Sequence, residues 1–327
     1  MRLAFLGGFG HHYLRGALAA NPDWQIAVSG DGQDSEAAKH LGNAIKGSHW
    51  FDDPRILLDE FKPDIVSIGA IYALNGELAA LALGRDIAVV SDKPIATSWA
   101  TLERLRELTN GTSRVLLTEF PFRSQKEFRA ARWAVQSGQI GEVVLATSQK
   151  SYRFGAARPS WYADRELYGG TLLWIASHSI DLIRFCSGVP YKRAIGTGGN
   201  ISRPNYGTME DHVAALYELS NGGTAIVHAD FLRPQSAPTH GDDRLRIAGS
   251  KGVVEVRDGR CLLISGALGE RDITNTIGGT PVHEELLKAV RGESTEFYST
   301  QESLEIAAIL LQSRDASEGQ SWKEFAG

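Results

Sequence analysis

A lysine follows a short apolar run near residue 90, a position where a charged side chain is unusual. The run Ile87–Val90 predicts a buried strand that ends at SDKP (residues 91–94), because proline cannot continue a central strand. Lysine is rarely buried without a partner. At the carboxyl end of a parallel strand, Lys93 would face the cleft in which open α/β sheets bind ligands, and its amine could hydrogen-bond a substrate hydroxyl. The alternative is a lysine that extends from the strand end into water.

A histidine and an aspartate stand three residues apart in YGGTLLWIASHSIDLIRF, where we expect a helix over Leu172–Phe185. Residues at this spacing share a helix face. His178 could therefore act as a general acid/base at neutral pH, while Asp181 fixes its orientation. The alternative is a core histidine with satisfied hydrogen bonds and an aspartate on the surface.

A glycine-rich turn follows the first predicted strand, in the sequence LGGFGHHYLRG. Gly8-Phe9-Gly10 stands where a dinucleotide-binding fold lets the backbone approach a pyrophosphate at the start of a helix. Tyr13 occupies the third glycine position of the GxGxxG pattern. Because the turn lies inside a predicted βαβ unit, we interpret it as a nucleotide site, and the alternative is an ordinary tight connection. The two histidines after the turn have no cluster of metal-ligating partners nearby in sequence, so no metal is expected.

An aspartate follows the second predicted strand, in AVSGDGQD. An acid about 20 residues beyond the glycine turn can accept hydrogen bonds from the adenosine ribose hydroxyls and repel a 2′-phosphate. Asp31 stands near that spacing, which favours NAD over NADP while leaving NADP open. A turn aspartate without a ligand role is the alternative.

Strand-like and helix-like stretches alternate over the first third of the chain, which predicts a parallel sheet with helices on both faces. We expect a doubly wound Rossmann domain over residues 1–120. The expected strands are Arg2–Leu6, Trp24–Ser29, Ser48–Phe51, Asp64–Gly69, Ile87–Ser91 and Arg114–Thr118, and the expected helices are His12–Ala20, Ser35–Leu41, Pro54–Phe61, Asn75–Leu83 and Trp99–Leu108.

The pattern changes after a helix expected over Gln125–Ser137. Hairpin-like spacing predicts a large, mostly antiparallel open sheet, so residues 121–327 form an α+β domain. The expected strands are Glu142–Arg153, Tyr191–Ile201, Val213–Leu219, Thr224–Leu232, Arg244–Ala248, Val253–Arg257 and Cys261–Ile264, and two helices, Val282–Val290 and Gln301–Arg314, close the chain.

Composition excludes several classes of function. The net charge of −5 and the absence of a Lys/Arg run argue against a nucleic-acid partner. No apolar stretch reaches the ~18 residues of a membrane span, and the N-terminus does not have the pattern of a signal peptide. Cys186 and Cys261 lie far apart without metal-ligand spacing, so we expect two packing residues in a reducing, cytoplasmic environment.

Together, these segments resemble the Gfo/Idh/MocA family of NAD(P)-dependent oxidoreductases over nearly the whole chain. The resemblance rests on the order and spacing of the glycine turn, PDIVSIG, SDKP in place of E-K-P, EFPFR, SGQIGEV, PSWYADRELYGGTLLWIASHSID, NGGTA and RIAGSKGVVEV. It implies a Rossmann domain that binds NAD or NADP and a C-terminal substrate domain. The open sheet of that second domain often forms the oligomer interface, which implies a homodimer or homotetramer.

The resemblance also implies roles for single residues. Lys93 would contact the nicotinamide side of the site and the substrate hydroxyl, and His178 would be the substrate-facing acid/base. Asn75 and Asp92 are expected on the cofactor side. The residues expected near the substrate are Arg123, Trp161, Tyr162 and Trp174.

Three positions depart from the family pattern, and the first is Tyr13 at the third glycine of the phosphate-binding turn. The family's D-x-x-x-H becomes Trp174-x-x-x-His178, so the carboxylate that usually pairs with the histidine is missing. Trp174 could present a flat face for a sugar ring or belong to the core, and Asp181 could replace the missing carboxylate as orienter. Asn75 stands where relatives carry the histidine of a T-P-x-x-x-H run.

Three functions are compatible with these residues. The first is an NAD-dependent dehydrogenase acting on a secondary alcohol of a sugar, inositol or related polyol. The second is a glycosidase that uses tightly held NAD for transient oxidation and elimination. The third is a non-catalytic NAD-binding sensor or regulatory subunit. The presence of Lys93 and His178 favours the dehydrogenase.

Overall fold

The computed structural model describes residues 1–33, 35–155, 158–266, 269–293 and 295–325. The chain forms two units, each built on its own sheet. The first comprises Met1–Phe120, Glu166–Gly169 and Pro281–Ala308, and the second comprises Pro121–Arg165, Gly170–Thr280 and Ile309–Gly327. Two late segments thus join the first unit, whereas the sequence pattern assigned everything after residue 120 to the second.

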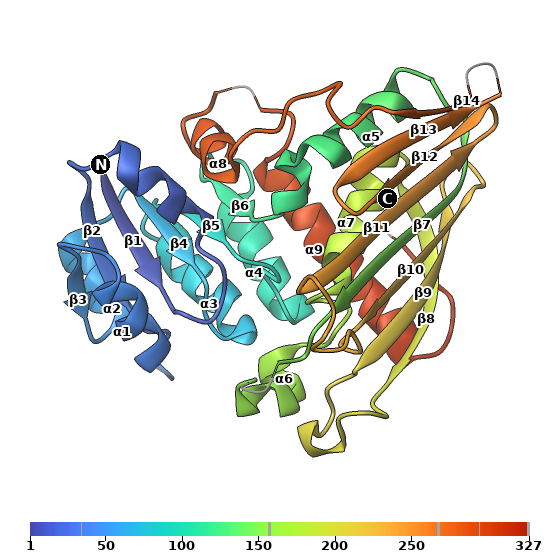
Figure 1. The fold of residues 1–327 in the computed structure, drawn as a ribbon. Coiled ribbons are helices and arrows are strands. Elements are labelled where there is room, and N and C mark those ends of the chain that lie inside the picture. Colours follow the sequence, from blue (N-terminus) through green and yellow to red (C-terminus); the bar gives the residue numbers. More distant parts are fainter. Residues whose placement is uncertain (34, 156–157, 267–268, 294, 326–327) are drawn as a thin grey trace. The chain divides into compact units, whose positions relative to one another are not determined.

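A six-stranded parallel sheet forms the centre of the first unit (Figure 1). Except for the outer strand β3, its strands are mostly buried, as expected for a parallel sheet covered on both faces. The strand order is β3-β2-β1-β4-β5-β6: β2 and β3 are added on one side of β1, and β4 to β6 on the other. This order confirms the predicted Rossmann topology. The strands are β1 (Arg2–Leu6), β2 (Gln25–Ser29), β3 (His49–Phe51), β4 (Ile65–Ile68), β5 (Ala88–Ser91) and β6 (Leu116–Thr118).

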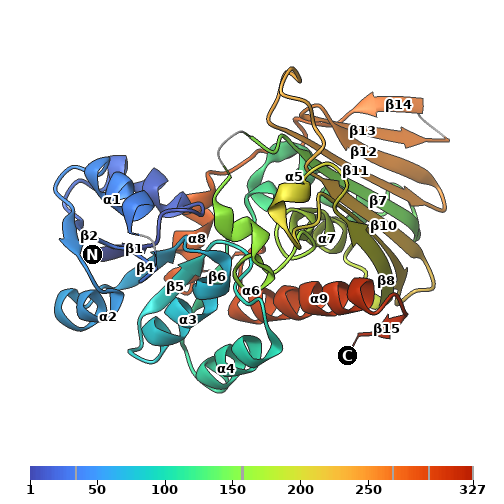
Figure 2. The ribbon, with the colours of Figure 1, turned by 90° about the horizontal axis from the view of Figure 1, so that it is seen from below.

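Helices cover both faces of this sheet, with η1 and α1 on one side and α3 and α4 on the other (Figure 2). The segment after the glycine turn is a 3-10 helix, η1, rather than the expected α-helix. The helices of the unit are η1 (Tyr13–Ala20), α1 (Glu36–Asn43), α2 (Pro54–Ile56), which continues into η2 (Leu57–Phe61), α3 (Tyr72–Leu83), α4 (Trp99–Thr109), α8 (Val282–Val290) and the first part of α9 (Thr300–Glu318).

Helix α8 belongs to the first unit because it packs closely on η1. A Cβ atom added to Gly16 of η1 would lie only 2.4 Å from Nδ1 of His283 in α8. The glycine therefore permits a close approach that no larger residue allows without a shift of the imidazole. This contact joins segments more than 260 residues apart in sequence, which periodicity alone does not reveal.

The second unit contains a nine-stranded sheet in the order β14-β13-β12-β11-β7-β10-β9-β8-β15. Only the β7–β10 pair is parallel, so the prediction of a mostly antiparallel sheet is confirmed. The strands are β7 (Val143–Tyr152), β8 (Tyr191–Gly199), β9 (His212–Leu219), β10 (Thr224–Asp230), β11 (Gly241–Gly249), β12 (Gly252–Arg257), β13 (Arg260–Ser265), β14 (Gly269–Asp272) and β15 (Lys323–Glu324).

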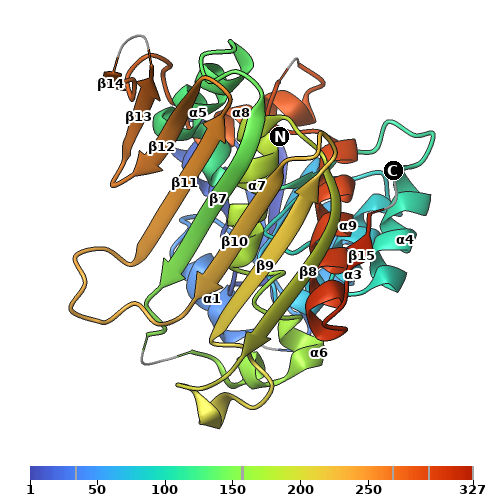
Figure 3. The ribbon, with the colours of Figure 1, turned by 90° about the vertical axis from the view of Figure 1, so that its right-hand side faces the viewer.

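Helices α5 (Lys126–Gln136) and α7 (Ala176–Ser187) cover one face of this sheet, and the other face is open (Figure 3). Burial alternates along β9 and β10 accordingly, as it does in a half-covered sheet. The short elements of the unit are η3 (Pro121–Ser124), η4 (Ser160–Ala163), η5 (Pro204–Tyr206) and Arg165 of α6 (Arg165–Tyr168).

Helix α7 begins at Ala176, later than the expected start at Leu172. Gly169 and Gly170 have φ angles of 79° and 115°, and the chain then forms turns before the helix starts. Such positive φ values are accessible mainly to glycine and interrupt a helix. Trp174 therefore lies in the turn before α7, while His178 and Asp181 lie within the helix.

Candidate active site

The glycine turn after β1 packs tightly against neighbouring backbone. A Cβ on Gly8 would lie 2.3 Å from the carbonyl carbon of Ala37 in α1. A Cβ on Gly10 would lie 2.6 Å from Oδ2 of Asp92 and 2.8 Å from Cα of Gly69. Only glycine fits at both positions, so the turn packs closely against α1 and against the segments that follow β4 and β5. Its approach to a pyrophosphate stays a prediction.

The backbone amides of the turn have acceptors within the same unit. Phe9 and Gly10 both donate to the carbonyl oxygen of Gly69, at 2.9 and 2.8 Å. The amide of His11 donates to Oδ2 of Asp92 at 2.9 Å, and the imidazole Nδ1 of His11 lies 3.2 Å from the same oxygen. Asp92 thus faces the start of η1, on the side where the sequence placed the cofactor.

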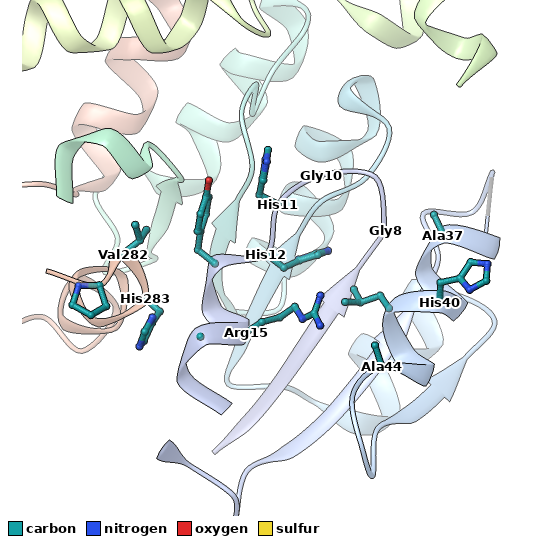
Figure 4. Close-up of a pocket in the computed structure, with 14 residues that line it drawn as sticks. Gly8, Gly10, His11, His12, Arg15, Ala37, His40, Ala44, Val282 and His283 are labelled. Carbon is teal, nitrogen blue, oxygen red and sulfur yellow. The ribbon is translucent and has the colours of Figure 1, made fainter. Parts of the chain in front are cut away.

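A cavity of about 940 Å³ adjoins the turn (Figure 4). Its volume lies within the roughly 300–1,000 Å³ of small-molecule and cofactor sites. Arg15 extends from η1 toward α1, where His40 lines the same cavity, and His283 lines it from α8. A guanidinium and several imidazoles suit the phosphates of a dinucleotide. The cavity, the guanidinium of Arg15, the imidazole nitrogens that can form hydrogen bonds and the glycines that lack Cβ atoms therefore fit NAD.

The imidazole of His12 holds the glycine turn in place through two hydrogen bonds. Its Nε2 lies 3.1 Å from the carbonyl oxygen of Gly7, and its Nδ1 lies 2.8 Å from Oγ of Ser67. Burial lowers the pKa of this imidazole to about 4. A neutral ring with Nε2 protonated satisfies both contacts, so His12 has a structural role as a hydrogen-bonding residue and is not a metal ligand. Among the residues that the structure describes, no group of three His, Cys, Asp or Glu side chains is arranged to bind a metal.

Asp31 lies at the carboxyl end of β2, where the ribose-binding acid was expected. Its Oδ1 accepts a hydrogen bond from the amide of Gln33 at 3.0 Å, and its Oδ2 accepts one from the amide of Ile71 at 3.1 Å. The carboxylate therefore joins the loop after β2 to the loop after β4. These contacts hold the acid in place, and its contact with a ribose stays a prediction.

Lys93 lies at the carboxyl end of β5 and is only 1% exposed, which excludes a lysine that extends into water. The Lys93–Pro94 peptide bond is cis. Asp92 accepts a hydrogen bond from the Lys93 amide through Oδ1, at 2.9 Å. Burial opposes a charge on Asp92, but His11 and then Lys93 counter this and hold the pKa of the carboxyl below its usual value.

Asn75 anchors the segment that carries Lys93. Its side-chain amide donates to the carbonyl oxygens of Asp92 and Pro94, at 3.3 and 3.1 Å, and its Oδ1 accepts from the amide of Ala70 at 3.0 Å. It is fully buried in α3. Asn75 therefore positions the backbone on both sides of Lys93, a role that the sequence did not reveal.

Glu119, the first residue of EFPFR, is a further acid at this edge for which the sequence predicts no role. It follows β6, is fully buried, and accepts a hydrogen bond from the amide of Tyr13 through Oε1, at 3.2 Å. Burial, and then the negative charge of Asp92, raise the pKa of Glu119 well above its usual value. Its only sequence signal is an acid directly after a parallel strand, at the edge where ligands bind.

In the second unit, His178 lies on α7, 4% exposed, with its ring edge-to-face against Phe122 at a centroid distance of 5.0 Å. Asp181 lies one turn further along the helix. Both of its oxygens accept hydrogen bonds from Arg123, with Nε at 3.0 and 3.2 Å and a closer contact from Nη2. Arg123, expected near the substrate, and Asp181, expected to orient His178, thus bind each other. Both expected roles stay predictions.

The aromatic residues expected near the substrate are all largely buried in the second unit. The rings of Trp161 and Tyr162 lie 4.4 Å apart in η4, and the hydroxyl of Tyr162 accepts a hydrogen bond from Arg158 at 2.9 Å. Trp174 is 5% exposed, and its carbonyl oxygen accepts from the hydroxyl of Ser177 at the start of α7. The structure places these residues without showing contact with a substrate.

Comparison with known families assigns both units. Residues 1–120 match the model described as "Oxidoreductase family, NAD-binding Rossmann fold", and residues 128–255 match the "GFO/IDH/MocA C-terminal domain". The chain belongs to the Gfo/Idh/MocA family. Its N-terminal unit is therefore an NAD-binding Rossmann domain, which confirms the family resemblance and the cofactor.

Several curated proteins and solved structures are similar to this chain. The D-glucoside 3-dehydrogenase of Escherichia coli is 27% identical over 65% of the chain and 66% of its own length. The myo-inositol 2-dehydrogenase of Thermotoga maritima is 26% identical over 62% of the chain and 59% of its own length. The chain thus spans about three fifths to two thirds of these curated relatives. A solved Thermotoga maritima structure assigned to the oxidoreductases is 29% identical, with a TM-score of 0.93 over 99% of this chain and all of that one.

Proposed function

We propose that this protein is an NAD-dependent dehydrogenase that acts on a secondary alcohol of a sugar, inositol or related polyol. The observation that carries the proposal is the buried amine of Lys93 at the carboxyl edge of an NAD-binding sheet. Relatives named as glucoside and inositol dehydrogenases support the substrate class. NAD is favoured over NADP because the carboxylate of Asp31 at the end of β2 would repel a 2′-phosphate.

Bound NAD supplies the hydride acceptor in this chemistry. Lys93 binds the substrate hydroxyl and handles its proton, while Asp92 and Asn75 hold the backbone of SDKP in place. His178 is the second residue that we assign to proton transfer. Trp174 and the neighbouring aromatic residues would provide apolar faces for a sugar ring.

Steady-state NADH absorbance across a panel of polyols, sugars and glycosides tests the proposal. Lys93→Met should lower kcat/KM by a factor of about 100 or more, the lower range for loss of a general acid/base. Lys46→Met provides the control, because Lys46 is an exposed lysine of the same unit. Turnover that is unchanged in Lys93→Met on a genuine substrate would remove the proposed role. Glycoside cleavage without net NADH would indicate oxidation and elimination instead.

Assembly and location complete the proposal. The open face of the nine-stranded sheet carries three exposed apolar side chains, Val144, Leu216 and Ile226, which are 54%, 38% and 39% exposed. We propose that a second copy of the chain covers this face. We also propose a cytoplasmic location, which the free and buried Cys186 and Cys261 support. No helix of the described residues has the length and apolar composition needed to cross a membrane.

A further inference from the structure

A second buried lysine lies in the second unit, far in sequence from Lys93. Lys150, on β7, is 1% exposed and forms an ion pair with Asp243, its direct neighbour across the antiparallel β7–β11 pair. Its Nζ lies 4.0 Å from the centroid of the Phe122 ring. Burial lowers the pKa of the amine to about 8, although Asp243 opposes this shift. Such a group needs an explanation, because fully buried lysines are rare.

A purely structural role explains this pair poorly. A buried ion pair is weak evidence for stability, since the cost of removing both charges from water offsets much of their attraction. The two side chains also differ in exposure. The lysine side chain is 2% exposed and the aspartate side chain 23% exposed. The amine is thus enclosed behind the carboxylate, while the carboxylate is partly open.

Asp243 opens onto a cavity of about 290 Å³ within the second unit, beside strands β11 and β12. The cavity lining also includes Phe122, Gln125, Thr239, Asp242 and Arg244. Asp242 is oriented in turn by two hydrogen bonds from Arg244, at 2.8 and 2.9 Å. An aromatic face beside oriented carboxylates, an amide and a hydroxyl matches the hydroxyl groups and apolar C–H faces of a sugar.

The charges of this cavity disfavour an acidic ligand. Lys150 pairs with Asp243, and Arg233 and Arg244 pair with Asp242, while two further carboxylates, Glu127 and Asp258, also line the cavity. Each carboxylate keeps lone pairs that can accept further hydrogen bonds from hydroxyl groups. An acidic sugar would instead bring its own charge toward these carboxylates.

Phe122 joins this cavity to the residue proposed for proton transfer. One ring lines the cavity, contacts the amine of Lys150 and packs edge-to-face against His178. Lys150, Phe122 and His178 therefore form one contiguous group within the second unit. A ligand that rests against Phe122 in the cavity lies one ring away from His178.

We propose that Asp243 binds hydroxyl groups of an uncharged sugar or polyol substrate in this cavity, and that Lys150 is the positioning residue that orients it. The inference rests on the proposed function and narrows its substrate class to neutral, polyhydroxylated compounds. It also makes the Lys150–Asp243 pair a determinant of which sugar is accepted.

The conservative variant Asp243→Asn tests the contact while preserving shape. It should raise KM for the substrate about tenfold or more, the effect of losing a hydrogen bond to a charged group, and change kcat less than about threefold. The effect should disappear for the one deoxy analogue that lacks the bound hydroxyl. Glu255→Gln is the matched control, because Glu255 forms a cross-strand ion pair with Arg246 on the same strand β11. An equal loss for every deoxy analogue would overturn the proposal.

Lys150→Met should give the same change in KM as Asp243→Asn, and the double variant should be no worse than either alone. Independent, multiplying effects would contradict a positioning role. Saturation-transfer NMR of the unreacted sugar separates this inference from the proposed function. Sugar signals that depend on Asp243 without any turnover would refute the proposed dehydrogenase activity and support sugar binding in the cavity. Turnover with an unchanged KM in Asp243→Asn would support the dehydrogenase activity and refute sugar binding by Asp243.

Discussion

Asp92 and Glu119 accept hydrogen bonds from backbone amides two residues apart at the start of η1, yet their pKa values shift in opposite directions. Asp92 receives the amide of His11, and Glu119 receives the amide of Tyr13. His11 and Lys93 hold the pKa of Asp92 below its usual value, whereas burial and the charge of Asp92 raise the pKa of Glu119 well above its usual value. This edge of the sheet thus favours a negative charge on Asp92 and opposes one on Glu119.

Glu119→Gln should stabilise the protein at neutral pH. The pKa of Glu119 is higher in the folded protein than its unfolded value of 4.5. Its contribution to the stability of the folded state is therefore complete below pH 4.5. That contribution is lost as pH rises toward the folded pKa, because the unfolded chain gives up the proton first. Glutamine keeps the acceptor for Tyr13 without this loss. The free energy of unfolding, measured with urea, should be higher for the variant at pH 7, and the difference should shrink toward pH 4.5. A difference that does not vary with pH would contradict the raised pKa of Glu119.

His12 should make the protein sensitive to acid in a defined range. Its folded pKa of about 4 lies below the ordinary histidine pKa of 6.5, so its contribution to stability is complete above pH 6.5 and is lost as pH falls toward 4. The loss amounts to at most about 3 kcal/mol. In NMR titrations the His12 ring should stay neutral down to pH near 4. His40→Gln, at an exposed imidazole, should leave the acid sensitivity unchanged.

Asn75→Ala should impair catalysis and stability together. The change removes three buried hydrogen bonds, including those to the carbonyls on both sides of Lys93. We expect a loss of about 2–4 kcal/mol in the free energy of unfolding. Because the Lys93 backbone loses its anchor, kcat should fall about tenfold or more. Asn43→Ala, at an exposed position, is the control. A variant that is less stable but has unchanged kcat would show that Asn75 does not position Lys93.

The Arg123–Asp181 pair should behave as one unit. Removing only the carboxylate in Asp181→Leu leaves an uncompensated buried guanidinium, which costs about 3–5 kcal/mol. The double variant Arg123→Met/Asp181→Leu should recover a large part of that loss in thermal or urea unfolding. Additive losses would show that the two side chains stabilise the unit separately.

The open sheet face should mediate association between copies. Leu216→Glu combined with Ile226→Glu places charges among the exposed apolar side chains of β9 and β10. Light scattering after size-exclusion chromatography should then report a monomer where the unmodified chain gives a dimer or tetramer. A monomeric unmodified chain would refute the proposed interface.

Much of the fold was predictable because local patterns determine it. The runs Arg2–Leu6 and Val282–Val290 were expected with the observed boundaries, and the glycine turn and Lys93 lie at the predicted edge of the sheet. These features depend on burial within a single segment and on the rule that parallel strands share their carboxyl ends.

The missed features depend on distant neighbours. Whether Glu119 is charged depends on Asp92, and whether Lys150 is paired depends on the register of β7 against β11. The contact of Gly16 with α8 joins segments that no periodicity relates. The sequence does not predict strand β14, because GERD contains no large apolar residue and therefore no alternation of apolar and polar side chains.

The two outer strands of the nine-stranded sheet have a consequence for how the protein avoids aggregation. Strand β14 at one border and strand β15 at the other are short and carry exposed charges. Another chain that tried to extend the hydrogen-bonded ladder would have to desolvate these charges, so growth into a continuous fibril is disfavoured at both ends. These two outer strands therefore restrict the sheet to a finite width, even though its central strands β7 and β11 are long.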